Sequence, residues 1–193
     1  MMRFPMIKFP FSERKAAQSA AYLVHLHGGS MNYMALIKLL YLADRRALIE
    51  RGLPITGDYM VSMPQGPVLS RVLDLINMGK PELPTSWFEY LSEPRAYNVR
   101  SVVSVTDKTA EELSPYELRL LREIHAAYGH LDRFKLRDLT HTLPEWTDPR
   151  GSSYPIPPED ILRAANKSEE EIERIAGDAA ELWLFSSLEN PDL

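Results

Sequence analysis

A long apolar stretch, from Met31 to Met78, constrains the fold of this chain more than any other feature. Its first part is expected to be one helix that starts after Ser30 as N-cap and ends at Arg51, before Gly52. With about 100° of rotation per residue, apolar side chains fall on almost every face of this helix. A helix of this kind is surrounded by other elements. The sequence therefore predicts a central, buried helix.

Asp44 is the exception on this helix, because it falls on an apolar face beside Ile37 and Tyr41. A buried carboxylate needs a hydrogen-bond or charge partner. One interpretation is a structural carboxylate tied to a backbone amide or to an arginine of the next helix, such as Arg71. The other is a polar residue inside a partner-binding groove. A catalytic acid is the weakest interpretation, since no second titratable group accompanies Asp44 at a recognisable spacing.

Turn residues follow Gly52, then a short strand from Tyr59 to Met63, and then a helix that begins with Gly66 and Pro67. The segment 97–105 is rich in β-branched residues and is the clearest strand signal in the chain. We expect it to pair with the strand at 59–63. The result would be one small antiparallel sheet of two or three strands.

The remaining pattern is helical, so the predicted fold class is mostly α (α+β), with about six helices around the central one. A capping box of Ser114 and Glu117 starts one helix, and Asp132 caps another. We expect a single domain over residues 12–188, an extended arm over 1–11 and a tail over 189–193. A helical domain without a formed sheet is the alternative.

Composition narrows the classes of function. The chain has 193 residues, 45% of them hydrophobic, no cysteine and a net charge of −5. It therefore offers no disulfide framework, and no apolar run approaches the roughly 20 residues that cross a bilayer. We expect a cytoplasmic protein without membrane contact. The negative charge argues against broad binding to nucleic acid, and Arg45, Arg46 and Arg51 are the one basic cluster near the end of the central helix.

Catalytic and metal-binding patterns are missing from the sequence. The five histidines, at positions 25, 27, 125, 130 and 141, form no HExxH or other metal motif. No serine stands in a GxSxG elbow, and no glycine-rich phosphate loop is present. The prediction is a protein that is not an enzyme and that has no cofactor and no metal.

The run from Lys38 to Val68, KLLYLADRRALIERGLPITGDYMVSMPQGPV, resembles the signature of the Panacea, or SocA-type, antitoxin domain. That signature has a K-L-L-Y-x-A-D helix, a G-x-P-I-T-G turn and a G-P-V helix start. A later segment, from His141 to Trp146, resembles the H-x-x-P-x-W element of the same family. The resemblance extends over roughly residues 31–146.

The resemblance implies a bacterial or phage protein that neutralises a toxin encoded beside it by direct binding. Two alternatives remain: an adaptor that delivers the toxin to a protease, and a DNA-binding regulator of its own promoter. The sequence does not fix whether the chain is a homo-oligomer. We expect the toxin to bind beside the Asp44 face, the strand and turn from Gly57 to Gly66, and the aromatic loop near Trp87 in the proline-rich segment 80–94. The candidate partner-binding residues are Lys38, Tyr41, Asp44, Tyr59, Met63, Gln65 and Trp87.

Overall fold

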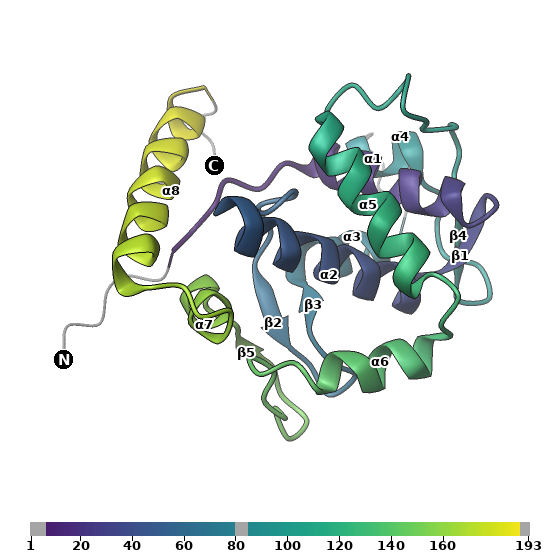
Figure 1. Ribbon diagram of the computed structural model, residues 1–193. Coiled ribbons are helices and arrows are strands. Elements are labelled where there is room, and N and C mark those ends of the chain that lie inside the picture. Colours follow the sequence, from purple (N-terminus) through teal and green to yellow (C-terminus); the bar gives the residue numbers. More distant parts are fainter. Residues whose placement is uncertain (1–6, 80–84, 190–193) are drawn as a thin grey trace.

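Helix α2 (Tyr33–Arg51) is the axis of the fold, and the other elements surround it (Figure 1). The computed structural model describes residues 7–79 and 85–189. Twelve residues of α2 are buried, which confirms the predicted central helix. Its N-cap is Asn32 rather than Ser30, and the Asn32 side chain accepts from the amides of the first turn. Gly52, with φ +73°, ends the helix as predicted.

Eight helices are present in the described residues. Five of the others contact α2, and the four besides the short α3 (Ser70–Asn77) are α1 (Glu13–Leu26), α5 (Pro115–Tyr128), α6 (Arg133–His141) and α7 (Pro158–Ala164). The predicted capping box at Ser114 and Glu117 starts α5, and Asp132 caps α6 through the amides of Phe134 and Lys135. These local signals therefore placed both helix starts correctly.

Two small antiparallel sheets lie against the helices, rather than one. The first pairs β1 (Ser30–Asn32) with β4 (Asn98–Arg100), and the second has the order β3 (Val68–Leu69), β2 (Met60–Ser62), β5 (Tyr154–Pro155). The predicted pairing of the segments at 59–63 and 97–105 is therefore wrong. The turn at 64–66 brings the chain straight back from β2 to β3, while the amide of Tyr33 donates to the carbonyl of Tyr97 and holds β4 near the start of α2.

Two short helices complete the body. Helix α3 (Ser70–Asn77) buries Val72, Leu75 and Ile76 and also contacts α2. Helix α4 (Ser86–Tyr90) packs on α1. The predicted aromatic loop is thus partly helical, and the residues of that loop from 80 to 84 lie outside the described part of the chain.

The described part of the N-terminal arm is packed on the body. Ile7 and Phe9 are buried, and the amide of Ile7 donates to Oε1 of Glu159 over 2.8 Å. Gly57 has φ +72°, and a Cβ there would lie 2.1 Å from the carbonyl oxygen of Pro10. A side chain at position 57 would therefore displace the arm. Residues 1–6 of the predicted arm and 190–193 of the predicted tail lie outside the described residues.

Helix α8 (Glu169–Glu189) stands at the edge of the molecule, at the left of Figure 1. It buries Ile172, Ile175 and Ala179, whereas Phe185 near its end is 63% exposed. None of the described helices is both long and apolar enough to cross a membrane.

Candidate functional site

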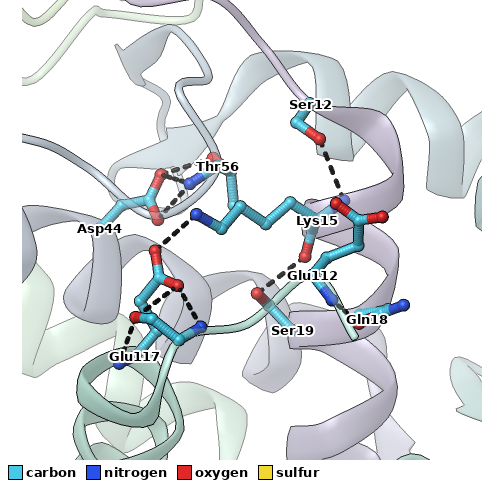
Figure 2. A network of polar contacts seen from close by, with 9 residues as sticks. Ser12, Lys15, Gln18, Ser19, Asp44, Thr56, Glu112 and Glu117 are labelled. Atoms are coloured by element: carbon cyan, nitrogen blue, oxygen red, sulfur yellow. Dashed lines mark hydrogen bonds and ion pairs between the residues drawn. The ribbon is translucent and has the colours of Figure 1, made fainter. Parts of the chain in front are cut away.

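Asp44 is held by the turn that follows α2. It is fully buried, and its carboxylate accepts from the amide of Thr56 at 3.1 Å and from the Thr56 hydroxyl at 2.5 Å (Figure 2). Burial raises the pKa of Asp44 to about 7. Two partners for Asp44 were considered from the sequence, a backbone amide and an arginine of the next helix. The structure shows the backbone amide, that of Thr56. Arg71 lies instead over the rings of Phe11 and Tyr59.

A second buried carboxylate, Asp58, holds the start of α3. Its oxygens accept from the amides of Tyr59, Arg71 and Val72 at 2.7, 3.0 and 2.9 Å. Burial raises the pKa of Asp58, against the opposite effect of these donors. The amides at the first turn of a helix have no partner within the helix, so an outside carboxylate satisfies them well. Asp44 and Asp58 thus fix both ends of the turn between α2 and β2.

Glu145 links the segment after α6 to α2. Its Oε1 accepts from the Tyr41 hydroxyl at 2.8 Å and from Nε of Arg45 at 2.6 Å, and its Oε2 accepts from Nη2 of Arg45 at 3.2 Å. The Glu145 side chain has no exposed surface. Burial, and then the negative charge of Glu145, raise the pKa of Tyr41. An arginine fork on a buried carboxylate is among the stronger hydrogen-bond arrangements in proteins.

Lys38 lies nearer the start of α2 than Tyr41. It belongs to the same layer of buried polar side chains between α2 and the segment 141–147. It is 1% exposed, and its Nζ donates to the carbonyl of Pro67 at 2.7 Å. Burial lowers the pKa of Lys38 to about 7. A Cβ at Gly66 would lie 2.7 Å from Oγ1 of Thr140 and 3.0 Å from Nζ of Lys38, so only glycine fits between α2 and α6.

The His141 and Trp146 rings stack 3.9 Å apart beside this lysine. Nε1 of Trp146 donates to the carbonyl of Met63 at 3.2 Å, so the tryptophan holds the turn that follows β2. Burial, and then the positive charge of Lys38, lower the pKa of His141. The two sequence elements recognised separately, at 38–68 and at 141–146, therefore form one connected layer.

An apolar groove of about 290 Å³ lies on the outer side of this layer. Three elements form it: the first two turns of α2, the turn at 63–65, and α3. Val68 and Lys38 also line it, the latter with its buried side chain. The remaining lining residues are Tyr33, Met34, Ile37, Met63, Pro64, Gln65, Leu73 and Asn77.

The structure brings three of the seven candidate partner-binding residues to this groove: Lys38, Met63 and Gln65. Tyr41 and Asp44 lie buried behind it. Tyr59 lines a different hollow, between the N-terminal arm and β5.

Trp87 is also separate from the groove. It is 1% exposed, and its amide donates to Glu13 at the start of α1. The sequence did not single out Tyr33, Met34 or Leu73, which line the groove. The one signal for Tyr33 and Met34 was that they continue the apolar faces of α2, and Leu73 on α3 had none.

The exposed feature of this region is the groove rather than the buried carboxylates. Asp44 has no exposed surface, so no substrate reaches it. Among the described residues, no group of three or more histidine, aspartate or glutamate side chains is placed to hold a metal ion. The accessible feature is an apolar hollow with a polar residue, Gln65, at its rim.

Comparison with known proteins agrees with the signature. No curated protein and no solved structure matches significantly. The profile described as "Antitoxin SocA-like, Panacea domain" matches residues 36–147, the span that contains the buried polar layer and all of the groove's lining residues except Tyr33 and Met34. The chain therefore belongs to the SocA-like antitoxin family, whose common unit is the Panacea domain.

Proposed function

We propose that this chain neutralises a cognate toxin by binding it directly, and that the groove between α2, the turn at 63–65 and α3 is the docking surface. The observation that carries the proposal is the groove itself. It is a mostly apolar hollow set in the region that defines the family. Hollows with this composition are typical of protein- and ligand-binding sites. The chain itself performs no chemical step in this proposal.

The groove combines a fixed frame with adaptable side chains. Trp146 holds the carbonyl of Met63, and the amide of Gly66 donates to the same carbonyl, so the turn is anchored from two sides. Met34 and Met63 are half-buried, unbranched side chains in the groove wall. Methionine adapts to partners of different shape, as in other surfaces that bind several targets.

In this proposal the buried candidate residues affect toxin binding indirectly, by fixing the position of the backbone. Lys38 sets the position of Pro67, and Asp44 that of Thr56. Tyr41 is tied to Glu145. We assign no direct toxin contact to these three residues.

The experiment uses the protein encoded by the neighbouring gene as the partner. Wild type should restore growth when both are expressed, and the two should elute together on gel filtration. Met34→Glu and Leu73→Glu place a charge in the groove and should abolish both effects. The matched control is Leu184→Glu, at an exposed site on α8, which should behave as wild type. Full neutralisation by both groove variants would overturn the proposal.

The same experiment separates blocking from delivery to a protease. A blocking antitoxin leaves the toxin level unchanged and acts at equal stoichiometry. An adaptor shortens the half-life of the toxin and acts below equal stoichiometry. We expect the first result, because direct binding in the groove requires no partner other than the toxin.

A further inference from the structure

A basic and aromatic surface lies at the start of α2, next to the groove. It is formed by the turn before β4 and by the first part of α6, which lie at the same side of the molecule in Figure 1. The segments 95–100 and 133–137 together contain five cationic residues and no acidic residue, although the whole chain has a charge of −5. We call this the basic–aromatic surface. Its members are Arg95, Tyr97, Arg100, Arg133, Phe134, Lys135 and Arg137.

The two rings of this surface are exposed at their edges to solvent and are flanked by arginines. Tyr97 is 61% exposed and Phe134 is 50% exposed. The guanidinium of Arg133 lies 5.5 Å from the centre of the Tyr97 ring and 4.7 Å from that of Phe134. The guanidinium of Arg137 lies 5.5 Å from the centre of the Phe134 ring. Arginine and aromatic side chains in this combination are enriched where protein interfaces gain most of their affinity.

Most of the cations have no anionic partner in the described parts of the chain. No ion pair is found there for Arg95, Arg100, Arg133 or Lys135, whereas Arg137 pairs with Asp138. The nearby Asp132 caps α6 by accepting from two backbone amides, and its charge also acts on Arg133 and Lys135. The five cations of the surface outnumber Asp132 and Asp138. The surface therefore retains positive charge that a partner is able to neutralise.

The surface is continuous with the groove. Tyr33 lines the groove and also lines the adjoining hollow, together with Arg95 and Tyr97. The rings of Tyr33 and Tyr97 are 6.2 Å apart. A partner seated in the groove thus reaches the basic–aromatic surface by passing over Tyr33.

We propose that the basic–aromatic surface receives an acidic segment of the same protein that the groove binds. The toxin would then carry an apolar anchor for the groove and carboxylates beside it. This inference rests on the proposed function and gives the chemistry of the partner. Complementary charge next to an apolar anchor speeds association and selects the partner.

A single-stranded nucleic acid fits the surface less well. Bases stack on open aromatic faces. Here the guanidinium groups of Arg133 and Arg137 lie against the faces of Tyr97 and Phe134. The surface also continues into a groove whose mostly apolar lining does not favour a charged phosphate backbone.

The test compares charge-reversal variants in binding to the purified product of the neighbouring gene. Arg133→Glu/Lys135→Glu places acids in the first turn of α6, where the helix dipole favours them, so the fold should hold. The matched control is Lys8→Glu/Lys108→Glu, which changes the net charge equally at two exposed sites away from the surface. Circular dichroism checks that every variant is folded.

At about 50 mM salt we expect the surface variant to weaken binding by about tenfold or more. At about 500 mM salt its dissociation constant should approach that of wild type, because screening removes the attraction. The control should bind as wild type at both salts. Unchanged affinity of the surface variant would overturn the inference while leaving the groove proposal intact. If wild type forms no complex at all, the proposed function fails and this inference fails with it.

A labelled single strand of about twenty nucleotides provides the other arm. We expect no binding that depends on Arg133 and Lys135. Binding of the strand that is lost in this variant, together with unchanged toxin binding, would assign the surface to nucleic acid instead.

Discussion

Two regions of the molecule use polar groups in opposite ways. One is the buried layer between α2 and the segment 141–147, and the other is the C-terminal helix α8. In the layer, side chains are buried and bonded to partners far away in the sequence, as Tyr41 is to Glu145. On α8, charged side chains are exposed and pair within one turn, as Arg174 does with Asp178. The profile match covers the first region and stops before the second.

The two regions differ in how much free energy is lost when one residue of a polar pair is replaced. A buried donor or acceptor that loses its partner costs its full desolvation energy, whereas an exposed pair adds little. The layer should therefore tolerate few substitutions, while α8 should tolerate many. The buried polar layer lies within the part of the chain that the family profile matches.

Glu145→Ala should give the largest effect, because it removes the acceptor of both Tyr41 and Arg45. Breaking a buried ion pair from one side costs about 3–5 kcal/mol. Urea unfolding measures the loss. Glu145→Gln keeps an acceptor for Tyr41 and should lose less. A loss below about 1 kcal/mol in Glu145→Ala would mean that Arg45 turns out to solvent, as an exposed residue would.

The pH dependence of stability should be the next largest effect. Asp44 keeps its proton up to about pH 7 in the native state, but only to about pH 4 when unfolded. Between these values the native state binds more protons, so the free energy of unfolding falls as the pH rises. For this single group the fall is about 2–4 kcal/mol.

Lys38 acts in the opposite direction above neutrality. Its native pKa is about 7, whereas the unfolded value is about 10.4, so the unfolded state binds more protons in this range. Stability should then rise with pH, which places a minimum near pH 7. Unfolding curves of wild type, Asp44→Asn and Lys38→Met at several pH values test both sides. Parallel profiles for the three proteins would contradict the assignment.

Asp44→Ala should lower the free energy of unfolding by about 1–3 kcal/mol, since the amide and hydroxyl of Thr56 lose their acceptor. Thermal unfolding measures it, and Glu173→Ala, at an exposed site on α8, is the control. If Asp44 contacts the toxin instead, the fold should hold and only toxin binding should weaken. A variant unchanged in both properties would remove Asp44 from both explanations.

Trp146→Phe should cost about 1 kcal/mol, because it removes one hydrogen bond to the carbonyl of Met63 and keeps most of the ring. Hydrogen exchange at the amide of Gly66, which shares that carbonyl, should become faster. Unchanged exchange would show that Gly66 holds the turn without the tryptophan.

Arg174→Ala should give the smallest effect, a change within about 0.5 kcal/mol. Its ion pair with Asp178 is exposed and lies within one turn of α8. Urea unfolding beside Glu145→Ala makes the comparison direct. A cost as large as that of Glu145→Ala would end the distinction between the two regions.

Local signals in the sequence predicted much of the fold. The apolar faces of α2, the capping box of Ser114 and Glu117, and the cap at Asp132 each depend on neighbours a few residues away. Such patterns are readable without knowing the rest of the chain. The pairing of β2 was not readable in this way. Its partner β5 lies about ninety residues later, in the proline-rich run 154–158, which has three prolines and no strand signal.

The groove was only partly predictable for the same reason. Met63 and Gln65 could be chosen because they lie beside the signature turn. Glu145 could not, since nothing near it reveals that Tyr41 and Arg45, a hundred residues earlier, point at it. Trp87 looked like a surface aromatic in a proline-rich loop, but it is packed under α1.

The contact between the arm and α7 also has a consequence for the order of events during synthesis. The amide of Ile7 meets Glu159, which lies 152 residues later in the chain. The seat of Ile7 is therefore incomplete until residue 159 has left the ribosome, whereas the contact of Pro10 with the turn at Gly57 is available much earlier. Contacts between such distant residues form late and slowly. The seated arm thus distinguishes a fully synthesised body from one that a premature stop has left incomplete.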